Sequence, residues 1–211
     1  MSIEATFFLP LGLDHIMIKK LALTLALASI SAAASASTLV YSEDFESYTA
    51  GLGGSGPQFT TYGGSLGTWT VTGNTVDTIR GGYNAITNIS LDLDGSPGNG
   101  GISRTIATVI GDVYQLNFDY AGNSGAQPFN VTFGTLTYGP LASASVVNFA
   151  SGFFTATSTS TTLSFAGVSP DVFNGGVIDN ITVTNVPEPG VLVLLLSGLV
   201  VGSIVSRRKQ K

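Results

Sequence analysis

Short apolar runs fill the chain between Ser37 and Val186, and Gly, Asn, Asp or Pro interrupts them every eight to twelve residues. Within the runs Thr, Val, Ile, Phe and Tyr alternate with polar residues, which is the period of a half-buried strand. No segment shows a sustained helical period. The predicted strands are Leu39–Phe45, Trp69–Val71, Asn88–Leu93, Ile102–Val109, Val113–Tyr120, Asn130–Phe133, Gly152–Thr157, Thr161–Phe165 and Val177–Val183. This spacing predicts an all-β sandwich of the jelly-roll type, with the Gly-rich stretch from Ala50 to Gly67 as a long connection.

A first long apolar run lies near the N-terminus. Lys19 and Lys20 precede the run Leu21–Ile30, and an Ala-x-Ala sequence ends at Ala36. This is the pattern of a secretory signal peptide, so we expect signal peptidase to cut after Ala36. Because Met17 stands directly before the charged region, residues 1–16 are interpreted as an over-extended gene start and 17–36 as the signal peptide. The alternative is a longer n-region that is translated.

A second apolar run occupies the C-terminal tail, residues 187–211. Pro187, Glu188 and Pro189 precede about 17 uncharged residues from Gly190 to Ser206. That length is near the lower limit for a transmembrane helix. The basic end that follows, which we expect to stay on the cytoplasmic side, consists of Arg207, Arg208 and Lys209. The prolines prevent the helix from extending upstream, so Glu188 is predicted to lie on an extended segment outside the membrane.

The order of box, apolar span and basic end resembles the PEP-CTERM sorting tail of exported bacterial proteins. Membership would imply cleavage by a membrane protease of the exosortase type. It would also imply transient anchoring in the inner membrane, followed by delivery to the cell surface or extracellular matrix. Gly190 stands where the family often has Ala or Ser. The alternative is a plain anchor that is never cut.

The segment 37–186, which would remain after both cuts, has an unusual composition. It contains no Cys, His, Lys or Met, and its two arginines face ten carboxylates, a net charge of 2 − 10 = −8. Nucleophiles assisted by His, thiolates and Schiff-base lysines are therefore excluded, and ordinary zinc ligands are missing. The acidic charge argues against nucleic acid as a partner. No catalytic residue is predicted, and the remaining oxygen donors suit calcium.

Several segments of this domain are similar to exported domains of the DUF642 kind, namely Leu91–Gly95, Gly101–Ile106, Gly111–Asn123 and Val177–Val183. The resemblance implies a galactose-binding-like jelly roll, related to carbohydrate-binding modules. It also implies an adhesive or glycan-binding role with no catalysis. The cysteines and the second tandem domain expected of that family are absent, which weakens the transfer of a ligand.

Asp179 is the most informative carboxylate. It shares the period-2 phase of Val177, Ile181 and Val183, which predicts that it points toward the core. A charge aimed inward needs a partner. The resembling modules often hold a structural calcium ion between the first and last strands. That resemblance implies a calcium site of Asp179 with Glu43, Asp44, Glu46 and Asp171. The alternative is a turn carboxylate bonded to backbone N–H groups.

Asp92 and Asp94 share one face of a predicted strand, and we interpret that face as solvated; the alternative is a glycosidase acid–base pair. Trp69 is expected in the core, with stacking on a sugar ring as its alternative. The tyrosines that could also stack on a sugar are Tyr62, Tyr83 and Tyr138.

Three functions remain open at this stage, and the glycan-binding residues are not identified. The first is an exported, non-enzymatic envelope or matrix protein that binds extracellular polysaccharide. The second is a secreted glycan hydrolase that uses an Asp/Glu pair. The third is a purely structural matrix protein.

Overall fold

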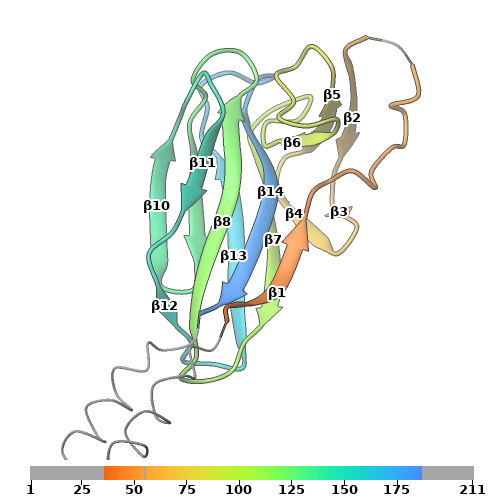
Figure 1. Cartoon of the computed structure of the whole chain (residues 1–211). Helices are drawn as coiled ribbons and strands as arrows, with labels where there is room; N and C mark the ends of the chain where they lie inside the picture. Colours follow the sequence, from red (N-terminus) through yellow and green to blue (C-terminus); the bar gives the residue numbers. More distant parts are fainter. Residues whose placement is uncertain (1–35, 55, 187–211) are drawn as a thin grey trace, which may run out of the picture. The chain divides into compact units, whose positions relative to one another are not determined.

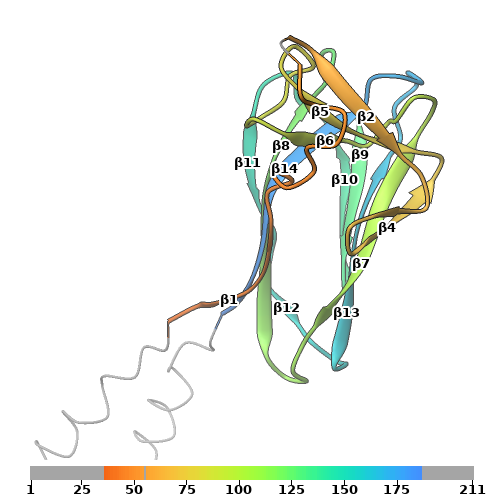
Figure 2. The same ribbon diagram turned by 90° about the vertical axis from the view of Figure 1, so that its right-hand side faces the viewer.

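Two antiparallel sheets face each other in the domain (Figures 1 and 2). The computed structural model describes residues 36–54 and 56–186. Sheet A contains β1 (Thr38–Glu43), β2 (Gln58–Tyr62), β5 (Val76–Arg80), β6 (Ser90–Asp92), β8 (Val113–Gly122), β11 (Val147–Ala150), β12 (Phe154–Thr155) and β14 (Gly176–Asn185). Sheet B contains β3 (Ser65–Leu66), β4 (Trp69–Gly73), β7 (Gly100–Ala107), β9 (Phe129–Phe133), β10 (Leu136–Leu141) and β13 (Ser160–Gly167).

The strand order is that of a jelly roll. Sheet A has the path β11-β8-β14-β6-β5-β2, and sheet B has the path β10-β9-β13-β7-β4-β3. From β6 to β14 the chain crosses between the sheets after almost every strand, and only the β9–β10 and β11–β12 connections stay within one sheet. The four-strand orders β6-β14-β8-β11 and β7-β13-β9-β10 therefore interlock as two Greek keys. The predicted all-β jelly-roll sandwich is confirmed.

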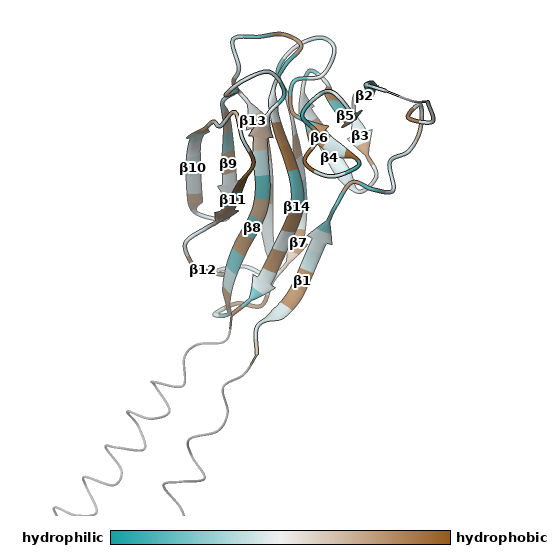
Figure 3. Cartoon of the chain, turned by 45° about the horizontal axis from the view of Figure 1, so that its top comes forward, coloured by the Kyte–Doolittle hydropathy of each residue, from teal (hydrophilic) through white to brown (hydrophobic). Residues whose placement is uncertain are grey.

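Alternating side chains of β8 and β14 build the core between the sheets, and Figure 3 shows this alternation as bands of hydropathy. Along β8 the even-numbered residues from Tyr114 to Tyr120 are buried, whereas the odd-numbered ones are half-buried. Phe118 lies at the centre, with ring centroids 5.1 Å from Phe165 and 4.8 Å from Phe149. Each such aromatic pair contributes about 0.5–1.5 kcal/mol beyond its buried area. The chain has no cysteine, so these contacts take the place of disulfides.

A β-bulge in β14 reverses the face on which its residues point. Asp179 pairs with Asp119, but Thr182 already pairs with Asn117, so two residues of β14 stand opposite one of β8. Asn180 takes the extra position, with a left-handed φ of 50°. Ile178 and Ile181 therefore both reach the core. Asp179 instead shares the outer face of sheet A with Asp119.

The prediction that Asp179 points into the core with Ile181 and Val183 is therefore wrong. A strict period of 2 does not survive an inserted residue. The Asp179 side chain is nevertheless fully buried, because residues outside the sheet cover this part of its outer face.

All nine predicted strands are present, but the sequence pattern misses five: β2, β3, β5, β10 and β11. β5 has four consecutive buried residues, including Asp77 and Thr78, so it shows no alternation. β10 contains Gly139 and Pro140, which are turn signals. β2 and β3 lie within the stretch that was predicted as a connection.

The two ends of the domain lie side by side, because β1 and β14 pair antiparallel and Thr38 stands opposite Asn185 (Figure 2). Within residues 36–54 and 56–186 there is no helix long and apolar enough to cross a membrane. The predicted signal peptide up to Ser35 and the predicted tail from Pro187 lie outside the described residues.

Candidate functional site

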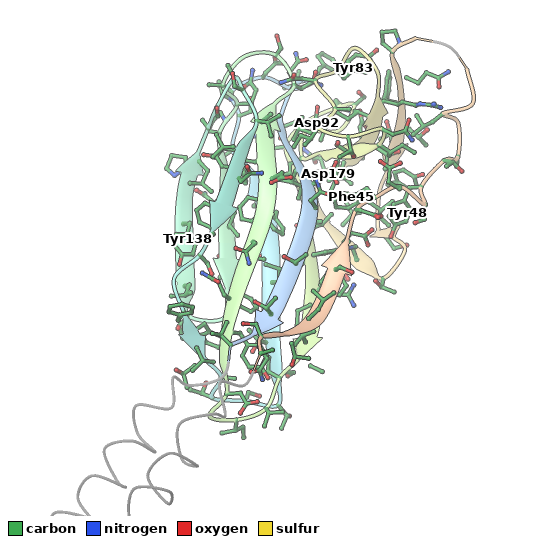
Figure 4. The ribbon with its side chains drawn as sticks, viewed as in Figure 1. Phe45, Tyr48, Tyr83, Asp92, Tyr138 and Asp179 are labelled. Atoms are coloured by element: carbon green, nitrogen blue, oxygen red, sulfur yellow. The ribbon has the colours of Figure 1, made fainter. Side chains whose placement is uncertain are left out.

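Glu46 and Asp179 come together on the outer face of sheet A, on either side of Thr87. Glu46 lies in the turn after β1, and Asp179 lies at the bulge of β14 (Figure 4). The Thr87 hydroxyl oxygen is 2.9 Å from Glu46 Oε1 and 2.6 Å from Asp179 Oδ2. The Ser90 hydroxyl also donates to Asp179 Oδ2 at 2.7 Å, and the Asn180 N–H donates to Oδ1 at 2.7 Å.

The two carboxyl groups differ in their electrostatics. Burial raises the pKa of Asp179, although hydrogen bonds from Thr87 and Ser90 oppose the shift. Burial also acts upward on the pKa of Glu46. There the hydrogen bonds from the Asn88 side chain, the Ile89 N–H and the Thr87 hydroxyl outweigh it, so the pKa is lowered. Glu46 is therefore an anion stabilised by hydrogen bonds beside a carboxyl group that burial penalises.

The Thr87 hydroxyl has more acceptors within reach than it has protons. A hydroxyl carries one hydrogen, yet the Thr87 oxygen lies within hydrogen-bond distance of both carboxylates and 3.3 Å from the Ile89 carbonyl. Carboxylate, hydroxyl and carbonyl oxygens around one point are the donors that calcium prefers. These oxygen types suit calcium, but each carboxylate oxygen of Glu46 and Asp179 already accepts a hydrogen bond from a side chain or a backbone N–H.

The other three predicted calcium ligands are engaged elsewhere. Glu43 Oε2 accepts the Trp69 indole N–H at 3.3 Å and lies near two tyrosine hydroxyls. Asp44 is exposed and accepts the N–H of Glu46 at 3.2 Å. Asp171 Oδ2 accepts from Asn174 at 2.8 Å in the β13–β14 loop.

The structure thus brings together two of the five predicted ligands. Among the described residues there is no group of three or more acidic, Cys or His side chains placed to hold a metal ion. Calcium at Glu46 and Asp179 stays a prediction, and it would need Thr87 and water to complete its shell.

Asp92 and Asp94 do not form the solvated face that the sequence predicts, because they are only 1% and 0% exposed. Asp92 Oδ1 accepts the Asp94 N–H at 2.9 Å, and its Oδ2 accepts the Asn123 side chain at 2.5 Å. Loops from neighbouring strands cover this face, and Gly175 packs where a Cβ would collide with both residues. A buried pair cannot reach a glycan, so these two residues do not supply a glycosidase acid and base.

Trp69 belongs to the core, as expected, since it is 1% exposed and its ring meets Phe165 edge-on. Tyr138 accepts the Gly152 N–H through its hydroxyl at 2.7 Å and packs on Phe149. Figure 4 shows Tyr138 on β10, whereas Tyr83 lies in the loop that follows β5.

The second group with ligand-binding potential is a pocket of about 340 Å³ beside β5, which we call the Arg80 pocket. Its lining residues are Gly54, Gly56, Arg80, Gly81, Thr87 and Asn88. The Arg80 guanidinium is fixed by donating to the Leu52 carbonyl at 2.8 Å. An exposed aromatic pair lies on the same two-strand segment but does not line the pocket. Phe59 on β2 and Tyr83 meet edge-on with centroids 5.9 Å apart, and Phe59 is 47% exposed. Because Gln58 pairs with Arg80 and Phe59 with Ile79, Phe59 points to the other face of the strand pair.

Sequence reasoning named Tyr83 as one of several tyrosines that could stack on a sugar, and it missed all six residues that line this pocket. Gly54 and Gly56 come from the connection between β1 and β2, whereas Thr87 and Asn88 precede β6. No local motif joins these segments. Only the pairing of β2 with β5, which the sequence does not predict, brings them together.

Comparisons with known proteins found structural neighbours only: no family model matches the chain, and no curated protein matches it. A family 35 carbohydrate-binding module from Clostridium thermocellum is 15% identical with a TM-score of 0.39, covering 59% of this chain and 96% of the module. The C-terminal family 22 module of C. thermocellum Xyn10B is 16% identical with a TM-score of 0.44. The match covers 70% of this chain and 93% of the module. A family 22 xylan-binding domain is 15% identical with a TM-score of 0.44, and the match covers 71% of this chain and 96% of that domain. The resemblance to DUF642 domains stays a prediction.

Proposed function

We propose that this chain is an exported protein whose β-sandwich binds an extracellular polysaccharide without catalysing a reaction. The observation that carries the proposal is the Arg80 pocket, and the exposed Phe59–Tyr83 pair on the same segment adds to it. The pocket is open, and its walls offer a fixed guanidinium, a hydroxyl and an amide. Sugar hydroxyls both donate and accept hydrogen bonds, and such groups fix the orientation of a bound ligand.

The exposed aromatic pair supplies an apolar surface of the proposed site outside the lining of the pocket. Phe59 and Tyr83 hold each other in an edge-on arrangement, so little side-chain freedom is lost when a ligand covers them. A pyranose ring has apolar C–H faces that suit such a surface. An ordered aromatic surface and a few polar groups are the usual components of a ligand-binding site.

Calcium enters this proposal through Thr87, which lines the Arg80 pocket and also separates Glu46 from Asp179. An ion held by the two carboxylates would fix the wall formed by Thr87 and Asn88. Calcium is therefore expected to strengthen glycan binding indirectly, without contacting the sugar.

The test is affinity electrophoresis of the full chain in detergent, with xylan, mannan, galactan or polygalacturonate in the gel. We expect at least one polymer to retard the protein, and Tyr83→Ala and Arg80→Gln each to weaken binding at least tenfold. The matched control is Phe153→Ala, since Phe153 is 63% exposed and does not line the pocket.

Three outcomes would contradict the proposal. Retardation by none of the polymers would favour a structural matrix protein. Equal binding by the Tyr83 and Phe153 variants would place the site elsewhere. Shortening of a polymer during incubation would identify a hydrolase.

Export and sorting form the second part of the proposal, supported by the predicted signal peptide and by the order of signals from Pro187 to Lys209. We propose that an exosortase-type protease processes the tail and that the product reaches the cell surface or matrix. Mass spectrometry of the mature C-terminus in each cell fraction tests this. A C-terminus at Lys211 in the extracellular fraction would refute processing.

A further inference from the structure

Asp94 is the most unusual charged group in the described part of the chain. It lies two residues after the end of β6 and is 0% exposed, yet neither of its carboxylate oxygens has a hydrogen-bond partner. A buried charge that lacks partners is very costly. Natural proteins seldom leave such a group uncompensated, so something must neutralise Asp94.

No basic side chain can do so. Between residues 37 and 186 the chain has no Lys or His and only two arginines. Arg80 donates to the Leu52 carbonyl. Arg104 lies 3.8 Å above the Tyr41 ring and donates to Thr68. The compensation must come from a bound cation or from a proton.

The surroundings of Asp94 offer further oxygen atoms. Asn99 stands opposite Asp94 in an antiparallel bridge, which places the two Cβ atoms about 5 Å apart. Asn99 Oδ1 is also buried and without a partner. The Asn99 side chain is fixed from its other end, because its Nδ2 donates to the Ser169 carbonyl at 2.9 Å.

Two further features bear on this place. Gly167 lets the Asp94 carboxylate pack directly against the backbone, because a Cβ at that position would collide with Asp94 Oδ1. Burial raises the pKa of Asp94 to about 7, and the like charge of Asp171 raises it further. The nearby Ser169 hydroxyl acts to lower this pKa, but its hydrogen-bond acceptors are Gln127 Oε1 and the Asn174 carbonyl rather than Asp94. The site therefore concentrates negative charge and neutral oxygen donors.

We propose that Asp94 and Asn99 bind a calcium ion at the end of the domain formed by the β6–β7 and β13–β14 loops. The carboxylate can bind in bidentate fashion and the amide adds a third oxygen, with water filling the remaining positions. Calcium fits better than magnesium, which demands a near-ideal octahedron, or zinc, which prefers nitrogen and sulfur.

This site differs from the one proposed for Glu46 and Asp179. It uses other residues and contacts neither carboxylate of that cluster, so it goes beyond the proposed function. Its ligand set contains a single bound carboxylate, so we expect a dissociation constant of about 0.1–1 mM, the range of extracellular calcium modules.

The test uses the full chain in detergent, stripped with EGTA, in an Asp179→Asn background that silences the other candidate site. Calorimetry with CaCl2 should detect one ion per chain in this background and none in Asp94→Asn/Asp179→Asn. For a dissociation constant near 1 mM, 10 mM calcium should raise the unfolding midpoint by about 3–6 °C, and the double variant should not respond. Asn99→Asp adds a second carboxylate and should tighten binding at least tenfold.

Equal calcium binding by the single and double variants would overturn the proposal, as would no binding by Asp179→Asn at 10 mM. A midpoint that falls between pH 5 and pH 8 and does not recover with calcium would show that a proton neutralises Asp94. A calcium response that is lost with Asp179→Asn alone would support the Glu46 site and reject this one. The two sites can therefore fail separately.

Discussion

Replacing Asp92 with Asn should make the domain more stable at neutral and alkaline pH. Asp92 is 1% exposed, and burial raises its pKa to about 7, with Asp94 and Asp77 as nearby like charges. Asn has the same shape. Its carbonyl oxygen can still accept the Asp94 N–H, and the Asn123 amide can turn over to accept from the new NH2 group.

The magnitude follows from linkage between protonation and folding. The unfolded carboxyl group has its ordinary pKa of 3.8, whereas the folded one titrates near 7. Between pH 5 and pH 7 the folded state therefore carries about one proton that the unfolded state lacks. Stability is then highest at low pH, falls as the pH rises at about 1.4 kcal/mol per unit, and levels off above pH 7. From pH 5 to pH 8 Asp92 alone should remove about 3 kcal/mol.

The assay is urea unfolding at pH 5, 6, 7 and 8 in EGTA, so that no divalent cation compensates the charge. Between pH 5 and pH 8, Asp92→Asn should lose about 3 kcal/mol less unfolding free energy than the native chain. The loss that remains should be the part caused by Asp94. Asp44→Asn is the matched control, since it changes the net charge equally at an exposed position. If the free energy of unfolding of Asp92→Asn fell with pH as steeply as that of the native chain, Asp92 would not be the group that titrates.

Three further substitutions test the packing and the backbone by chemical denaturation. Trp69→Ala should cost about 3–5 kcal/mol, because Trp69 is 1% exposed, and a cost below 1 kcal/mol would refute its place in the core. Gly175→Ala should cost more than 2 kcal/mol, since a Cβ there meets Asp94, whereas Gly53→Ala, with open space around it, should be neutral or slightly stabilising. Asn180→Ala should cost about 1–2 kcal/mol because of the left-handed φ at the bulge, and Asn180→Gly should cost less; equal costs would argue against backbone strain.

The sequence pattern was sufficient for the fold class because most strands have one face toward a single core. β8 alternates over eight residues, from Val113 to Tyr120, and such a signal survives without knowledge of the partners. β5 gave no signal because both of its faces are covered. The site was harder to predict, since it depends on pairings between segments distant in the chain.

Two errors about single residues have the same origin. Asp179 was assigned to the wrong face because a bulge leaves no recognisable mark in the sequence Ile178-Asp179-Asn180-Ile181. Asp92 was assigned to solvent because strand periodicity separates two faces but does not say which one a loop will cover. Burial by loops is a tertiary effect, and local patterning does not contain it.

The position of β14 has a consequence for the order of folding. It is the last strand of the described domain, yet it lies between β8 on one side and β1 and β6 on the other. Until β14 has emerged, β1 has no partner in the sheet and β6 pairs only with β5. A chain synthesised from its N-terminus therefore cannot close its core until about residue 185 is available. Such delayed closure would keep the polypeptide unfolded, and so able to thread through a narrow translocation channel, until nearly all of the domain has passed.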